Sequence, residues 1–162
     1  MTDLAITQLP AAPLHVLEIW SNPAAVAKRF AKAYGATLPA TGSSLQLPSM
    51  QLIRYEPTVW LVEGEIGGLA EVLGTDGSLT AIGGGVVRVR LSGPGWRGLL
   101  MEGGVFDAEA VSFAPGCSAA TVIDHVNVRL LVESDDACLA YIPLSYAHGM
   151  IHFWTAAAKV LV

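Results

Sequence analysis

The stretch SAATVIDHVNVRLLVESDDACLAYI, residues 118–142, decides the fold class. It divides into three short runs rich in apolar and β-branched residues, separated by polar turn residues at 124–125 and 134–136. Connections this short join antiparallel neighbours, because parallel strands need a crossover of about a dozen residues or more. The pattern predicts an antiparallel meander with strands over 118–123, 126–132 and 138–142.

A helix is predicted after the meander. Pro143 closes the last strand because proline cannot donate to a strand ladder, and Ser145 is a typical N-cap residue. Apolar residues then recur at helical spacing and give the helix a broad apolar face. They are Met150, Ile151, Trp154, Ala158 and Leu161.

A strand followed by a helix is predicted upstream of the meander. In residues 87–91, valine and leucine alternate with Arg88 and Arg90, which is typical of a half-buried strand. Ser92 suits the N-cap of a helix that Gly103-Gly104 ends. The apolar side of this helix consists of Trp96, Leu99 and Leu100, and residues 105–116 read as a loop.

The N-terminal half is less strongly patterned. Ser21 as N-cap and Pro23 in the first turn predict a helix that Gly35 ends. Strands are predicted over 14–20, 45–47, 50–55 and 58–62, a short helix over 69–73 and a turn over 75–78.

These elements predict an α+β fold with mainly antiparallel sheet and packed helices. A chain of 162 residues is long enough for one buried core, or for two small lobes sharing one. Residues 1–13 are Pro-rich and aperiodic. We therefore expect an N-terminal arm over 1–13 and a single domain over 14–162.

The composition favours association with a partner. Charged residues make up 14% of the chain and hydrophobic residues 52%, whereas a typical soluble domain is about 25% charged. So few charges cover a surface thinly, and large exposed apolar patches mark partner surfaces. The alternative is a core that is merely large.

The charge pattern excludes several other classes of protein. The formal net charge is −5 and no run of Lys or Arg occurs, so the footprint of a nucleic-acid or anionic-membrane binder is missing. No apolar stretch reaches the roughly 18 residues of a membrane span, and no secretory signal pattern is seen. We expect a cytoplasmic protein in which Cys117 and Cys138 stay reduced.

Three stretches carry a family resemblance: RVRLSGPGWRGLL at 88–100, FAPGC at 113–117 and YIPLSYA at 141–147. In their order and spacing, residues 58–162 resemble the gamma subunit family of heterotetrameric sarcosine oxidase. The resemblance implies an aminomethyltransferase-like (folate-binding-domain-like) fold, because the Leu-Ser-Gly-Pro turn is shared with that wider group.

The resemblance further implies a small subunit without catalytic, cofactor-binding or metal-binding residues, which assembles with alpha, beta and delta-type subunits. FAD, FMN, NAD and tetrahydrofolate would belong to the whole complex, which would demethylate sarcosine or a related N-methyl amine oxidatively. Two alternatives remain: a free-standing folate-binding domain of the aminomethyltransferase-like group, and a homo-oligomeric binding module.

Several residues suggest chemistry of their own. His148 and His152 are four apart on the predicted terminal helix and could share a metal ion, although no third ligand is evident. Cys117 and His125 could form an activated thiol pair. Gly83-Gly84-Gly85 and the Ser92–Gly95 turn are weak candidates for anion binding, and Ser92 and Ser145 for nucleophiles, but bends and helix caps explain them equally well.

Arginine and tryptophan supply the candidate interface residues, because both are enriched where proteins meet. The set is Arg88, Arg90, Trp96, Arg97, Arg129 and Trp154. For Trp96 and Trp154 a place in the core is the alternative.

Overall fold

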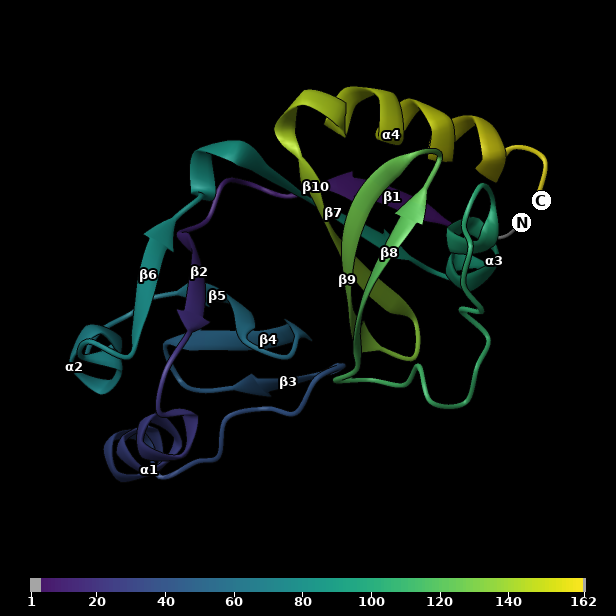
Figure 1. The fold of residues 1–162 in the computed structure, drawn as a ribbon. Helices are drawn as coiled ribbons and strands as arrows, with labels where there is room; N and C mark the ends of the chain where they lie inside the picture. The colour runs from purple at the N-terminus through teal and green to yellow at the C-terminus, as the bar shows by residue number, and fades with distance from the viewer. Residues whose placement is uncertain (1–3, 162) are drawn as a thin grey trace. The chain divides into compact units, whose positions relative to one another are not determined.

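The computed structural model describes residues 4–161, which form two antiparallel five-stranded sheets and four α-helices. By their internal contacts the residues group into two compact units. The terminal unit comprises residues up to Ala11 together with those from Gly84 onward, and the internal unit comprises Ala12–Gly83. The predicted α+β fold with mainly antiparallel sheet is confirmed (Figure 1).

The sheet of the terminal unit contains the predicted meander. Its strand order is β1-β7-β10-β9-β8, and every neighbouring pair is antiparallel. The strands are β1 (Ala5–Gln8), β7 (Val86–Ser92), β8 (Ser118–Ile123), β9 (Val126–Ser134) and β10 (Ala137–Pro143).

The turn between β8 and β9 consists of Asp124 and His125, both with positive φ, at 45° and 65°. Two successive left-handed residues match the right-handed twist of the flanking strands, which is why a two-residue hairpin adopts this conformation. The boundary at 124–125 was therefore correctly predicted from the sequence.

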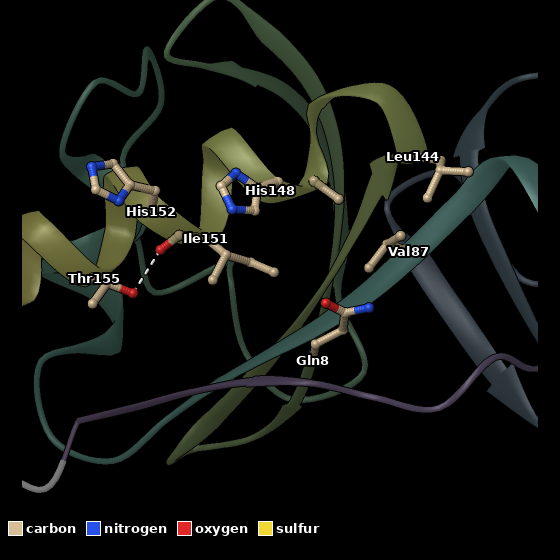
Figure 2. A pocket seen from close by; sticks show the side chains of 8 residues that line it. Gln8, Val87, Leu144, His148, Ile151, His152 and Thr155 are labelled. Atoms are coloured by element: carbon tan, nitrogen blue, oxygen red, sulfur yellow. Dashed lines mark hydrogen bonds between the residues drawn. The ribbon is translucent and has the colours of Figure 1, made fainter.

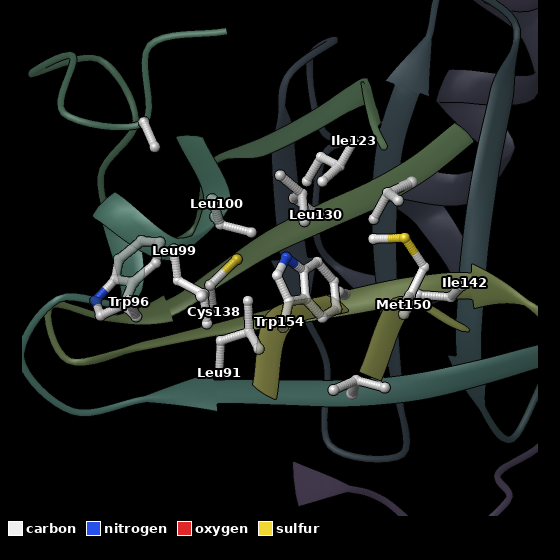
Figure 3. Close-up of a cluster of buried hydrophobic side chains, with 14 of the residues drawn as sticks. Leu91, Trp96, Leu99, Leu100, Ile123, Leu130, Cys138, Ile142, Met150 and Trp154 are labelled. Atoms are coloured by element: carbon white, nitrogen blue, oxygen red, sulfur yellow. The ribbon is translucent and has the colours of Figure 1, made fainter. Parts of the chain in front are cut away.

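Two helices complete the terminal unit. α3 (Trp96–Met101) follows β7, and α4 (Leu144–Ala158) follows β10 directly and packs against β10, β7, β1 and α3. Figure 1 shows α4 running along one side of the sheet. Buried side chains from these strands and helices form one continuous hydrophobic cluster, in which Trp154 of α4 lies among residues of α3, β9 and β10 (Figure 3).

The internal unit has its own sheet and its own hydrophobic cluster. The strand order is β3-β4-β5-β2-β6, again antiparallel throughout. Helices α1 and α2 pack against each other and contribute buried residues to the cluster. The elements are β2 (Leu14–Ile19), α1 (Pro23–Tyr34), β3 (Ser43–Gln46), β4 (Met50–Glu56), β5 (Val59–Gly64), α2 (Leu69–Leu73) and β6 (Gly77–Ala81).

Two strands were not predicted. Residues 5–8, expected as part of an aperiodic arm, form β1 and pair with β7 from Ala5↔Ser92 to Gln8↔Val89. Residues 77–81, expected partly as a turn, form β6 and pair with β2. At Gly77 the two strands come so close that a Cβ would lie 2.2 Å from the Glu18 carbonyl oxygen, so this edge strand begins at a glycine.

The predicted helix N-caps were wrong, whereas Gly35 ends α1 as predicted. Asn22, Gly95 and Pro143 occupy the N-cap positions of α1, α3 and α4, and none of these caps has a side-chain hydrogen bond. Ser92 is the last residue of β7, where it continues the ladder, and Ser145 lies inside the first turn of α4. At α3 the chain enters the helix through a left-handed residue, φ 90° at Gly95, which glycine adopts without strain.

Candidate functional site

A groove runs between helix α4 and strands β1 and β7 of the terminal unit. It has a volume of about 460 Å³, within the size range of ligand pockets. Figure 2 shows α4 on one side and the strand that carries Gln8 on the other, with Val87 between them. Eight residues line the groove: Gln8, Val87, Leu144, Ala147, His148, Ile151, His152 and Thr155.

The helical repeat explains which residues of α4 reach the groove. Ala147, Met150 and Trp154 are buried and anchor the helix to the sheet. The residue that follows each of these three in the sequence lies beside them on the helix surface. His148, Ile151 and Thr155 therefore line the groove. A short strand on the open side of β7 supplies Gln8, and this is why the groove depends on the unpredicted β1.

The groove is lined by apolar side chains and by polar groups without formal charge. None of the eight lining residues is Lys, Arg, Asp or Glu. The Thr155 hydroxyl donates to the Ile151 carbonyl oxygen at 2.7 Å, which leaves two imidazoles and the Gln8 amide as the other polar groups. This lining suits apolar or uncharged material, because a charged group would lose hydration without gaining a partner.

His148 and His152 both line the groove, as expected from their spacing. Within residues 4–161, however, no three His, Cys, Asp or Glu side chains come together in a way that could hold a metal ion. The two imidazoles remain a pair.

The proposed thiol pair is wrong. Cys117 directly precedes β8, whereas His125 is the second turn residue after it, just before β9. The eight residue steps between them, mostly extended chain, span about 26 Å. Cys138 lies in the hydrophobic cluster, where burial raises the pKa of its thiol to about 12. Neither cysteine is therefore set up as a nucleophile.

The glycine candidates have structural roles. Gly83–Gly85 forms a single 3₁₀ turn ahead of β7, so it does not open a helix toward a ligand. The Ser92–Gly95 turn precedes α3, whose six residues are too few for a developed helix dipole.

The two candidate tryptophans belong to the core of the terminal unit. Trp96 is 2% exposed and its Nε1 donates to the Asp135 carbonyl oxygen at 2.9 Å. Trp154 is fully buried. The sequence left an interface position and a core position open for these tryptophans, and the structure supports the core position for both.

The candidate arginines make internal contacts. Arg90 forms a two-pronged ion pair with Glu133 across β10, with Nε to Oε2 at 2.6 Å and Nη2 to Oε1 at 2.8 Å. Arg88 donates to the Pro10 carbonyl oxygen and so ties the N-terminal segment to β7. Arg129 is half-buried on β9. Their role at an interface stays a prediction.

Arg97, at the start of α3, binds the backbone of the long 105–117 loop. Its guanidinium lies 4.3 Å from the ring centre of Trp96 and donates to the carbonyl oxygens of Ala108 and Phe113. Such a contact combines cation–π attraction with hydrogen bonds to backbone that would otherwise stay unpaired.

One polar network was missed by sequence analysis. In the internal unit the Asp76 carboxylate accepts hydrogen bonds from Ser21, Asn22 and Arg29. These hydrogen bonds lower the pKa of Asp76 to about 2. The donors lie about 50 residues away in the chain, so local patterning gave no sign of the contact.

The sequence matches no protein-family model and no curated protein. Among solved structures, a chain of the heterotetrameric sarcosine oxidase from Corynebacterium sp. U-96, solved with pyrrole 2-carboxylate, superposes with a TM-score of 0.84 at 16% identity. The match covers 96% of this chain and 84% of that one. This chain has the fold of a sarcosine oxidase chain.

The same fold recurs inside a larger enzyme. The glycine cleavage system aminomethyltransferase T from Bartonella henselae superposes with a TM-score of 0.65 at 15% identity, over 93% of this chain and 45% of that protein. This chain therefore spans less than half of the aminomethyltransferase. The predicted likeness to sarcosine oxidase and to the aminomethyltransferase group is confirmed at the level of fold.

No helix within residues 4–161 is both long enough and apolar enough to cross a bilayer.

Proposed function

We propose that this chain is a small assembly subunit of an amine-oxidising enzyme complex and carries no catalytic residues of its own. The main support is the match to the sarcosine oxidase chain, which extends over 96% of this chain and 84% of that one. That protein is a heterotetramer, so a chain of this fold and comparable length acts there as one part of a larger assembly.

The surface chemistry supports the same proposal. Only 14% of residues are charged, and large apolar side chains are exposed on the terminal unit at Val105, Leu144 and Tyr146. Apolar surface of this kind is stabilised when a partner covers it.

In the proposed complex, sarcosine or a related N-methyl amine is oxidatively demethylated and tetrahydrofolate accepts the one-carbon unit. The flavins, NAD and folate are bound by the partner chains, and the assembly acts in the cytoplasm. Support for the one-carbon theme comes from the shared fold with an aminomethyltransferase.

The experiment that tests the proposal is co-expression of this chain with candidate flavoprotein subunits from neighbouring genes, followed by affinity purification through a tag on this chain. A yellow complex that oxidises sarcosine or another N-methyl amine is the expected product. Leaving out this chain should reduce the yield of the complex.

The alternative function, a free-standing folate-binding domain, is favoured by the aminomethyltransferase likeness. It predicts that the isolated chain binds tetrahydrofolate in an equilibrium titration. The groove along α4 offers no Lys or Arg to the carboxylates of folate, which is why we prefer the assembly subunit.

A further inference from the structure

We propose that the groove along α4 and the free edge of β1 together bind an extended, uncharged segment of a partner chain, which adds a sixth strand to the sheet of the terminal unit. This inference rests on the proposed function and names the surface through which the subunit joins its complex. Its support comes from the helix, the strand and the groove, taken in turn.

Helix α4 has the composition of a covered helix. None of its 15 residues, LSYAHGMIHFWTAAA, is Asp, Glu, Lys or Arg. Its outward side chains include Leu144 and Tyr146, which are 57% and 55% exposed. A helix whose outer face stays in water typically carries charged or polar residues there. The exposed polar residues of α4, such as Ser145, His148 and Thr155, carry no formal charge. Helix α1 of the same chain differs from α4 in this respect, because it carries the charged residues Lys28, Arg29 and Lys32.

Strand β1 has a free edge that is open to pairing with another strand. It is the terminal strand in the order β1-β7-β10-β9-β8, and within the described residues no strand pairs with its outer side. Solvent-exposed edges of soluble proteins are protected by short length, by Lys, by Pro or by a bulge. At four residues β1 is short, but it has no bulge. β1 reads Ala-Ile-Thr-Gln and contains no charged residue or proline.

The outward backbone groups of β1 can be identified. The amide of Leu9 donates to the Arg88 carbonyl oxygen at 2.9 Å, so odd-numbered residues face β7. In an antiparallel ladder, inward and outward residues alternate. The amides and carbonyls of Ile6 and Gln8 therefore point away from β7, toward an incoming strand.

The groove selects the side chains of the incoming strand. A strand places every second side chain on the same face, about 6.6 Å apart, so one face of an added strand would look into the groove beside β1. Val87, Ala147 and Ile151 present apolar surface there. Because none of the lining residues carries a formal charge, the segment must be apolar on that face and uncharged.

A second copy of this chain does not fit this description. If β1 of a second copy were the added strand, its Ile6 would have to fill the groove, but Ile6 is already half-buried against its own hydrophobic cluster. The remaining side chains of β1 are Ala5, Thr7 and Gln8, which are small or polar. A strand of a different chain is the occupant that we infer.

The test compares two substitutions at one position in the co-expressed complex. Gln8→Pro removes the outward amide and leaves the ladder to β7 intact, whereas Gln8→Ala keeps the amide and removes only the side chain. Losing one backbone hydrogen bond should weaken binding of the partner about fivefold for Gln8→Pro relative to Gln8→Ala.

A second pair of variants tests the groove. Leu144→Glu places a charge at the groove and should weaken binding at least about tenfold, because that charge is desolvated in the complex. Val111→Glu is the matched control, since Val111 is 96% exposed on the 105–117 loop. Hydrogen exchange completes the test: the amides of Ile6 and Gln8 should become protected when the complex forms.

The outcomes separate the two proposals. If the wild-type chain assembles, but Gln8→Pro matches Gln8→Ala and the amides of β1 stay unprotected, the docking site is wrong while the subunit role stands. The docking site is also wrong if Val111→Glu disrupts assembly and Leu144→Glu does not. It is wrong as well if Leu144→Glu abolishes a dimer of the isolated chain, because the surface would then bind a second copy. If the wild-type chain does not form a complex with any flavoprotein, the subunit role itself fails, and the docking site with it.

Discussion

Arg97 lies over the indole ring of Trp96, with its guanidinium carbon 4.3 Å from the ring centre. The two residues are adjacent in sequence at the start of α3, and their stacking directs the guanidinium toward the carbonyl oxygens of Ala108 and Phe113. One side chain thus holds the 105–117 loop against the helix that precedes it.

Arg97→Ala should lower the free energy of unfolding by about 2–3 kcal/mol, because two hydrogen bonds from a charged donor and a cation–π contact are lost together. Arg97→Lys should recover part of this, since a lysine keeps the charge but not the fork of donors. Urea denaturation of the three proteins measures the difference. Equal stability of Arg97→Ala and wild type would show that the loop is held by its apolar contacts alone.

Asp76 should make the stability of the internal unit depend on acidity. Its pKa falls from the ordinary 3.8 to about 2 in the folded chain, chiefly because of hydrogen bonds from Ser21 and Arg29. The folded state therefore binds fewer protons than the unfolded state, so the contribution is complete above about pH 4 and is lost as the pH falls toward 2.

The measurement is unfolding by urea between pH 2 and 5, for wild type and Asp76→Asn. The wild-type protein should lose stability more steeply than the variant as the pH falls. Parallel curves of unfolding free energy against pH for the two proteins would mean that the charge of the Asp76 carboxylate does not contribute to stability.

The two cysteines should differ in their reaction with a thiol reagent. Burial raises the pKa of Cys138 to about 12, and its side chain is enclosed in the hydrophobic cluster, while Cys117 is half-exposed. Because the thiolate is the reactive form, iodoacetamide at pH 8 should label Cys117 first in the native protein and both residues in urea. Mass spectrometry locates the label, and rapid native labelling of Cys138 would contradict the packing described here.

Substitutions in the hairpin turn between β8 and β9 should be able to stabilise the folded protein. Asp124 and His125 both adopt left-handed conformations, which cost L-residues energy and which Asn-Gly adopts readily. The double substitution Asp124→Asn, His125→Gly should raise the free energy of unfolding by about 1 kcal/mol. A thermal melt compares it with wild type. A lower melting temperature would indicate that the present side chains make stabilising contacts at the turn.

Local pattern was enough to predict much of the fold. The meander over residues 118–142 was predicted because its side chains alternate and its turns are short, and both signals lie within a few residues of each other. The terminal helix was predicted from the spacing of Met150 and Trp154, which are buried as expected. These are the features that one segment determines without reference to another.

Features that depend on distant segments could not be predicted. β1 has only four residues and becomes a strand because β7, about 80 residues later, offers it an edge. β6 likewise depends on pairing with β2. The division into two hydrophobic clusters also follows from pairing, since the sequence shows which residues are apolar but not which of them meet.

The candidate site was predicted only in part. The spacing of His148 and His152 correctly placed both on one flank of the last helix, but the opposite wall of the groove, Gln8, lies in a segment that we expected to be an arm. The free edge beside it could not be inferred before β1 was known.

The central claim is that this chain is one subunit of a flavin-containing complex. Native mass spectrometry of the tagged chain, co-expressed with candidate flavoprotein subunits from neighbouring genes and purified through the tag, tests this most directly. The account predicts a yellow sample that gives a single species, whose mass is that of this chain together with the flavoprotein chains and bound flavin. A colourless chain that stays alone beside those subunits, and that binds tetrahydrofolate by itself, would contradict it.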